Sequence, residues 1–156
     1  MVNPKTTVVK KIAFFILLSF IVVGQVKATE DKLFEKQSWL SSIGWSDYIR
    51  SISQGDGTIV AVIDEGVWQE HPDLQNNIWV NSKEVAQNSV DDDNNGYVDD
   101  YYGWNFIDNN SDMTTKGSHG TQVAGIIAAE HNSIGIAGIA PKTKIKSLIA
   151  CNEDKC

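Results

Sequence analysis

The chain has 156 residues, enough for one modest domain, and its hydrophobic content of 42% suits a chain that folds around a core rather than a disordered one. The formal net charge is −7. This acidic balance argues against nucleic acid as a partner and suits solubility and cation binding.

The first 28 residues differ from the rest and are typical of a signal peptide. A basic start that includes Lys10 and Lys11 precedes an apolar stretch at 12–24, and small residues then lead to a predicted cleavage point after Ala28. A membrane anchor is the alternative, but the 13-residue stretch is shorter than the roughly 20 residues of a spanning helix. We therefore expect a secreted mature chain, 29–156, with 9 basic and 20 acidic residues and no membrane contact.

The mature chain begins with a polar lead. A helix is predicted around Trp39–Ile49, followed by a turn at Gln54–Gly57. The β-branched run at 58–63 is typical of a strand that is buried on both faces of a parallel sheet. Residues 80–102 are polar and indicate a long loop.

The second half of the chain adds a helix and a strand. Residues 119–129 are apolar on all sides, which predicts a buried helix, and residues 145–150 predict a second strand. Strand, helix and strand together indicate a βαβ unit and an α/β fold. Because ligands and chemistry gather beyond the carboxyl ends of parallel strands, Asp64 is a candidate site residue.

Three segments carry a recognisable pattern. The first is VAVIDEGV at 60–67 with HPDL at 71–74, the second is GSHGTQVAG at 117–125, and the third is NSIGIAGIAP at 132–141. In this order they closely resemble the subtilases, the subtilisin-like serine proteases, over roughly residues 37–156. The resemblance implies a parallel-sheet, subtilisin-like α/β fold that stops after its first βαβ portion, so the chain is identified as the N-terminal part of the catalytic domain.

The resemblance assigns Asp64 and His119 to a catalytic triad of Asp, His and Ser, and it implies polypeptide substrates. A Ser hydroxyl becomes a nucleophile when an imidazole takes its proton, and a carboxylate on the other ring nitrogen fixes the tautomer. His119 is expected in the first turn of its helix, where the dipole disfavours the protonated ring. Gly120 and Gly125 are expected to let this helix approach the sheet, and His71 is expected to be structural.

The chain departs from the family pattern at functional positions. Glu65 stands where Thr or Ser usually follows the Asp, and it would disfavour the charged form of Asp64 unless it points to solvent. Gln122 replaces a common second His. The 156 residues contain no Gly-Thr-Ser-x-Ala segment, so the nucleophile is missing, and Ser118 does not replace it. The two hypotheses are a fragment of a serine endopeptidase and an inactive, secreted, Ca²⁺-binding protein.

An acidic loop, DDDNNGYVDD at 91–100, predicts a Ca²⁺ site. In the frame that starts at Asp91 the spacing is that of an EF-hand-type loop, with Gly96 at position 6; the predicted ligands are Asp91, Asp93, Asn95, the Tyr97 carbonyl and Asp99. Position 12 is Tyr102 instead of Glu, and Asp100 is a candidate substitute. A solvated acidic loop is the alternative, but five carboxylates repel one another without a cation.

The resemblance implies a second Ca²⁺ site. Many subtilases bind Ca²⁺ with the Asp of the HPDL turn, an N-terminal Gln and the loop after the catalytic His helix. The matching positions are Asp73, Gln37, the side chain of Asn132 and the carbonyls of Glu130, Ile134 and Ile136.

The end of the chain leaves two expectations. Cys151 and Cys156 either pair with each other or pair with partners outside this chain, and both readings stay open. The strand at 145–150 is expected next to an unpaired edge, so the isolated chain is predicted to fold poorly.

Overall fold

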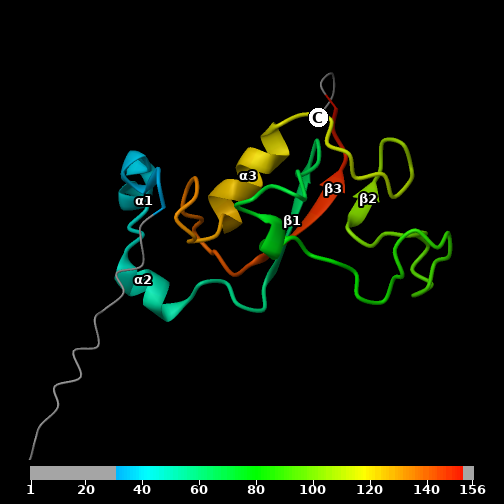
Figure 1. Cartoon of the computed structure of the whole chain (residues 1–156), viewed down its shortest axis with the longest axis horizontal. Helices are drawn as coiled ribbons and strands as arrows, with labels where there is room; N and C mark the ends of the chain where they lie inside the picture. The colour runs from blue at the N-terminus through cyan, green and yellow to red at the C-terminus, as the bar shows by residue number, and fades with distance from the viewer. Residues whose placement is uncertain (1–30, 153–156) are drawn as a thin grey trace, which may run out of the picture.

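The computed structural model describes residues 31–152, so the predicted signal peptide and Cys156 lie outside the described residues. The elements in chain order are η1 Phe34–Lys36, α1 Ser38–Ser42, α2 Asp47–Ile52, β1 Ile59–Asp64, η2 Gln75–Asn77, β2 Gly103–Asn105, α3 His119–Ala128 and β3 Lys144–Ile149. Figure 1 shows the sheet with α3 beside it, and the short helices α1 and α2 stand apart at one end. Cys151, just after β3, is disulfide-bonded.

The three strands form one parallel sheet in the order β1-β3-β2. β1 pairs with β3 along its whole length, from Ile59↔Lys144 to Asp64↔Ile149. The predicted parallel α/β fold is therefore confirmed, and the two predicted strands differ from β1 and β3 by only one residue. The expectation that the second strand lies next to an unpaired edge is wrong within residues 31–152, because β3 lies in the centre, between β1 and β2.

The core lies between the sheet and α3. Its buried members are Val62, Val67, Leu74, Ile78, Ala124, Ala128 and Ile145. Strand side chains alternate, so Val62 faces this core while Ile59 and Ile63 on the other face are 57% and 63% exposed. Burial of β1 on both faces is thus a wrong prediction for the described residues, since nothing there covers its second face.

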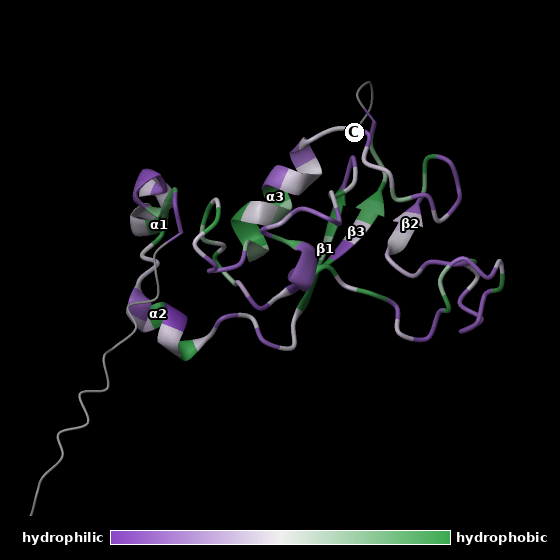
Figure 2. Ribbon diagram, in the orientation of Figure 1, coloured by the Kyte–Doolittle hydropathy of each residue, from purple (hydrophilic) through white to green (hydrophobic). Residues whose placement is uncertain are grey.

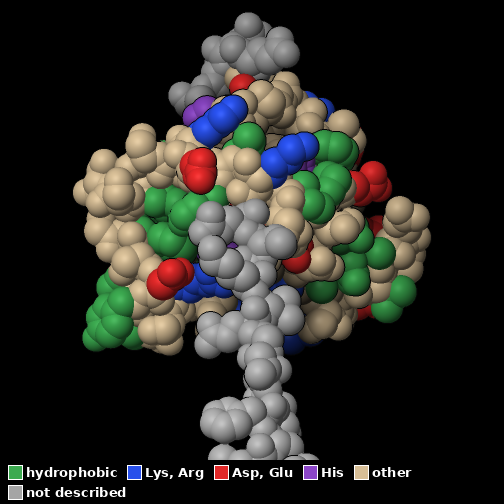
Figure 3. Space-filling view, turned by 60° about the vertical axis from the view of Figure 1, so that its left-hand side comes forward, with side chains coloured by type: hydrophobic (Ala, Val, Ile, Leu, Met, Phe, Trp, Pro, Cys, Tyr) green, Lys and Arg blue, Asp and Glu red, His purple; other side chains and the backbone are tan. Residues whose placement is uncertain are grey.

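The helix α3 also buries only one stripe. Gly120, Ala124, Gly125 and Ala128 are buried, while Ile126 is 43% exposed. The expectation of burial on all sides is therefore wrong within residues 31–152. The surface seen from the side of α1 and α2 carries several separate hydrophobic patches (Figure 3), in line with the numerous exposed apolar side chains.

The single helix predicted around Trp39–Ile49 is two short helices. Gly44 has a φ of 74°, a left-handed conformation that ends α1. Ser46 then begins α2 by accepting a hydrogen bond on its hydroxyl from the Ile49 N–H at 3.4 Å.

The loop at 80–102 has no helix or strand, as predicted, and is mostly hydrophilic (Figure 2). It leads into β2, which the sequence analysis missed. At Gly103 a Cβ would overlap the Ser147 carbonyl oxygen, so only glycine lets β2 pair closely with β3. Among residues 31–152 none of the helices has the length and apolar character to span a bilayer.

Candidate functional site

The side chains of Asp64 and His119 meet where strand β1 ends and helix α3 begins. Asp64 is the last residue of β1 and His119 is the first residue of α3. The distance from His119 Nδ1 to Asp64 Oδ2 is 2.7 Å, and the side chains are 70% and 10% exposed, respectively. In the tautomer whose Nδ1–H donates to the buried carboxylate, the other ring nitrogen, Nε2, keeps its lone pair.

The approach of α3 to β1 depends on one glycine. A Cβ at Gly120 would overlap the Gly66 carbonyl oxygen and come within 3.1 Å of the Asp64 Cβ. A Cβ at Gly125 would lie 3.5 Å from the Ile136 side chain, which is an ordinary contact. Close packing therefore requires glycine at the first position and not at the second, where the sequence analysis expected both.

The neighbours of the pair do not provide a nucleophile. The Glu65 N–H donates to Asp64 Oδ1 at 2.8 Å, and the Glu65 carboxylate lies where a Cβ at Gly117 would be. Ser118 accepts a hydrogen bond from the Gln122 amide at 3.2 Å. Within residues 31–152, His119 Nε2 has no hydrogen-bond partner, so the base is open for a group from outside this region.

His71 has a structural position. Its Nδ1 accepts a hydrogen bond from the Asp73 N–H at 3.2 Å, and its ring lies edge-on to Trp68 with centroids 5.1 Å apart. These contacts fix the turn that presents Asp73.

Asp73 is buried with an unsatisfied carboxylate oxygen. The residue is 2% exposed, Oδ2 accepts a hydrogen bond from the Ile136 N–H at 3.2 Å, and Oδ1 has no partner among the described residues. Burial raises the pKa of Asp73, and the negative charge of Asp31 raises this pKa further. At Gly135 a Cβ would overlap the Asp73 carboxylate, so the loop wraps closely around it.

The loop at 130–136 packs closely around Asp73. Besides the Ile136 N–H, the Glu130 N–H donates to the Asp73 carbonyl at 3.0 Å. The Asn132 side-chain oxygen accepts from the Ile134 N–H at 2.9 Å. The N–H groups of Glu130 and Ile136 thus hold this loop against Asp73.

Asp31 is a site residue that the sequence analysis missed. It is 6% exposed, and its Oδ1 accepts hydrogen bonds from the N–H groups of Asn132 and Ser133 at 2.8 and 2.7 Å. Gln37 instead bonds Ala137, accepting from its N–H at 2.7 Å and donating to its carbonyl at 2.9 Å. No local sequence signal distinguishes Asp31 from a surface acid, because its burial depends on a loop a hundred residues away.

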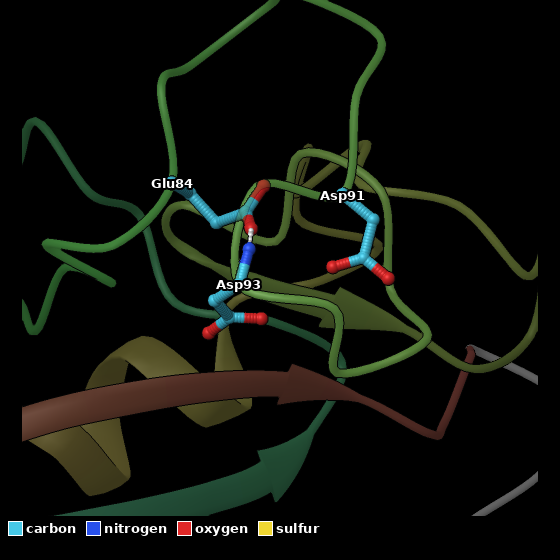
Figure 4. A group of neighbouring side chains, drawn as sticks. All are labelled: Glu84, Asp91 and Asp93. Atoms are coloured by element: carbon cyan, nitrogen blue, oxygen red, sulfur yellow. Dashed lines mark hydrogen bonds between the residues drawn. The ribbon is translucent and has the colours of Figure 1, made fainter.

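The acidic loop brings some of its predicted ligands together. Oxygen atoms of Asp91, Asp93 and Glu84 lie within 4.8 Å of one another (Figure 4). Asp99 turns away and accepts hydrogen bonds from the N–H groups of Asn88 and Ser89 at 2.9 and 3.0 Å.

Hydrogen bonds with asparagine side chains hold the rest of the acidic loop together. Asp100 is 3% exposed and accepts from the Asn81 side chain at 2.7 Å and from the Asn95 side chain at 3.3 Å. The Tyr97 N–H donates to Asn95 Oδ1 at 2.8 Å. These bonds hold the loop compact around the carboxylates.

Comparisons with known proteins give one consistent result. A family model described as the subtilase family matches residues 55–156. Subtilisin-like protease 1 of Plasmodium vivax is 47% identical over 100 residues, 63% of this chain and 16% of that protein, and thermitase of Thermoactinomyces vulgaris is 39% identical over 95 residues, 60% of this chain and 26% of that protein.

The structural comparison agrees with this family match. Fervidolysin from Fervidobacterium pennivorans, a keratinolytic enzyme related to subtilisin, superposes with a TM-score of 0.57 at 28% identity. The superposition covers 78% of this chain and 16% of fervidolysin. The chain spans only 14% to 17% of the length of the first Plasmodium relatives it matches.

Proposed function

The chain belongs to the subtilase family, and from this premise we propose that it is the N-terminal part of a secreted serine endopeptidase that cleaves polypeptides with an Asp-His-Ser triad. One observation carries the proposal: the 2.7 Å contact between Asp64 Oδ2 and His119 Nδ1, which joins two elements 55 residues apart. The residues around this contact are the motifs on which the family resemblance rests.

In the proposed reaction, His119 Nε2 takes the proton of a Ser hydroxyl as the oxygen attacks the scissile carbonyl carbon. The buried Asp64 carboxylate stabilises the imidazolium that forms. The imidazolium then gives its proton to the leaving amine. The Ser belongs to a segment that these 156 residues do not contain.

A chimera tests this proposal. Residues 31–152 would replace the matching segment of thermitase, which supplies the Ser and the remaining elements, and peptide hydrolysis would be measured. We expect activity, a loss of about 10⁴-fold for Asp64→Ala and a loss of about 10⁶-fold for His119→Ala, the sizes found when single triad members are removed. Glu65→Gln, beside Asp64 but outside the triad, is the matched control and should stay active. A folded chimera without activity, or one that His119→Ala leaves unchanged, contradicts the proposal.

We also propose structural Ca²⁺ binding near Asp73. Three observations support this: Asp73 Oδ1 has no partner among the described residues, the Asp31 carboxylate accepts hydrogen bonds from the loop at 130–136, and this loop wraps closely around Asp73 at Gly135. Hard oxygen donors of this kind suit Ca²⁺. The proposed ligands are Asp73, Asp31, the Asn132 side chain, the carbonyls of Glu130, Ile134 and Ile136, and Gln37.

The second proposed Ca²⁺ site is the acidic loop, where Asp91, Asp93, Asn95 and the Tyr97 carbonyl stay as proposed ligands and Asp99, which turns away, does not. The gathering of Asp91 and Asp93 supports it. Calorimetry of the full chain would compare Asp73→Ala with Asp91→Ala/Asp93→Ala. Each variant should lose one Ca²⁺-binding event. Equal heats of Ca²⁺ binding in the parent and in either variant would contradict the proposal of the corresponding site.

Secretion is proposed from residues 1–28. Fusing them to a reporter enzyme in a secreting host should release a product whose N-terminus is Thr29, as mass spectrometry would show. A product that stays in the membrane with its first 28 residues attached would favour the anchor reading.

The second candidate function is a Ca²⁺-binding protein without catalysis. The buried Asp73 oxygen without a partner among the described residues and the carboxylate cluster of Glu84, Asp91 and Asp93 favour it. Sequencing the DNA that follows the Cys156 codon separates the two, because an in-frame or once-frameshifted codon run for that segment supports the enzyme.

A further inference from the structure

Glu84 is buried beside the acidic loop with one carboxylate oxygen unpartnered. The residue is 4% exposed, and its Oε1 accepts a hydrogen bond from the Asp93 N–H at 3.1 Å. Within residues 31–152, Oε2 is buried without a hydrogen-bond partner. Burying a carboxylate oxygen in this way is unfavourable unless a positive group meets it, so the position requires a ligand.

The surrounding oxygens have the separations that one cation needs. One oxygen each of Glu84, Asp91 and Asp93 lies within 4.8 Å of the others. Figure 4 shows the Glu84 side chain reaching toward the Asp93 backbone N–H, to which a dashed line joins its carboxylate, with the Asp91 carboxylate to one side. Ca²⁺ binds oxygens at about 2.3–2.6 Å, so ligands on opposite sides of the ion are about 5 Å apart. A single Ca²⁺ therefore fits all three.

The described part of the chain offers these carboxylates no basic side chain. Its ion pairs involve other acids, namely Asp47, Asp56, Asp64 and Asp108. The N–H groups of Asn95 and Gly96 donate to Asp91 at 3.0 and 2.8 Å, which orders the loop but adds no full positive charge. A cation is thus the missing partner of the cluster.

We propose that Glu84 is a direct Ca²⁺ ligand together with Asp91 and Asp93, and that it supplies the carboxylate that Tyr102 cannot supply at position 12 of the loop. This inference rests on the Ca²⁺ binding proposed above for the acidic loop. Because Glu84 lies outside the EF-hand-type frame, the ion joins the segment at 81–84 to the segment at 91–100 and closes the loop from its N-terminal side.

Asp99 has a different role in this arrangement. Both of its carboxylate oxygens accept backbone hydrogen bonds, from Asn88 and from Ser89. Asp99 therefore orders the turn between Glu84 and Asp91 and is not a ligand of the ion in this arrangement.

Trypsin provides a local readout in the full chain, because the exposed Lys83 directly precedes Glu84. If Ca²⁺ orders this segment, it should slow cleavage after Lys83. Mass spectrometry would follow the fragment that ends at Lys83 relative to the fragment that ends at Arg50 in α2, which is the internal reference for any effect of Ca²⁺ on trypsin.

Two variants with the same change in charge distinguish a Ca²⁺ ligand from an acidic residue that only lies nearby. Glu84→Gln keeps the shape and the acceptor for the Asp93 N–H, and it should raise the Ca²⁺ concentration for half-protection at least about tenfold. Asp92→Asn is the matched control. Asp92 is exposed, accepts from the Val85 N–H and the Asn88 amide, and lies outside the cluster, so the midpoint should not change.

The outcomes distinguish this inference from the proposal beneath it. Protection of the parent with an unchanged midpoint in Glu84→Gln would overturn Glu84 as a ligand and leave the loop as a Ca²⁺ site. An equal shift in Asp92→Asn would also overturn it, since net charge alone would then explain the result. A parent chain that Ca²⁺ does not protect would overturn both.

Discussion

At the residue scale, substitution of the two glycines of α3, Gly120 and Gly125, is expected to have opposite effects on stability. Gly120→Ala places a Cβ against the Gly66 carbonyl, so α3 must move away from β1. We expect a loss of about 1–3 kcal/mol of stability and a loss of activity in the thermitase chimera, because His119 moves with the helix. Thermal unfolding and peptide hydrolysis would measure the two effects.

Gly125→Ala is the control for this change. Its Cβ makes only an ordinary contact with Ile136, and alanine restricts the unfolded chain, so a gain of about 0.5–1 kcal/mol is expected. If Gly120→Ala were as stable as Gly125→Ala, the close approach would not hold the catalytic pair together.

The buried Asp73 carboxylate predicts that the stability of the folded state depends on pH when Ca²⁺ is absent. Burial raises its pKa above the ordinary value of 3.8, so without a cation the folded state binds the proton more tightly than the unfolded state. The resulting stabilisation is present below pH 3.8 and is lost as the pH rises through the raised pKa. In EDTA, the parent chimera should therefore lose stability relative to Asp73→Asn as the pH rises through this range.

In Ca²⁺ and above the raised pKa, the parent chimera should instead be more stable than Asp73→Asn, because Ca²⁺ binds the charged carboxylate of the folded state. Thermal melts at several pH values, in EDTA and in Ca²⁺, would measure both effects. Parallel pH profiles for the parent and Asp73→Asn in EDTA would show that the buried carboxylate is not under electrostatic strain.

At the scale of elements, the two faces of β1 predict opposite effects on solubility. Ile59 and Ile63 lie on the exposed face, while Val60 and Val62 lie toward the core. Ile59→Thr/Ile63→Thr should lower aggregation of the full chain, because threonine keeps the strand propensity and removes exposed apolar surface.

Val60→Thr/Val62→Thr is the matched pair on the inner face. It buries hydroxyls in the core and should increase aggregation through partial unfolding. Light scattering over a concentration series would measure both variants. Equal aggregation in the two would mean that the exposed face of β1 is not the surface through which chains associate.

At the scale of the whole molecule, the 156-residue chain is expected to have no peptidase activity of its own. It contains the base and its carboxylate partner but no Gly-Thr-Ser-x-Ala segment. Casein should stay intact, and a fluorophosphonate probe should label no serine. A labelled serine, Ser118 above all, would contradict the assignment of roles at the site.

The same chain is expected to be marginally folded without Ca²⁺. Within residues 31–152 one face of β1 is uncovered and the outer edge of this strand is unpaired, so much of the burial in the sheet is one-sided. Ca²⁺ should raise the melting temperature, because it binds the folded form. A cooperative melt above about 50 °C in EDTA, with protected amides in β1, would contradict this and favour the stand-alone binding protein.

The sequence by itself determined the features that local pattern encodes. The β-branched run before Asp64 and the apolar run that begins at His119 predicted β1 and α3 to within a residue, because strand and helix signals repeat over a few positions. The pairing of Asp64 with His119 was implied by the resemblance of their motifs to the subtilases. The EF-hand-type spacing likewise placed Asp91 and Asp93 in one cluster.

Only the tertiary structure decided which distant segments meet. The central position of β3, the close approach at Gly103 and the burial of Asp31 and Glu84 all depend on contacts between residues far apart in the chain or outside any repeating pattern. Glu84 and Asp31 look like ordinary surface acids in the sequence, since nothing in their neighbours signals burial. Their carboxylates become candidate ligands only because chain packing removes water and leaves acidic oxygens facing one another.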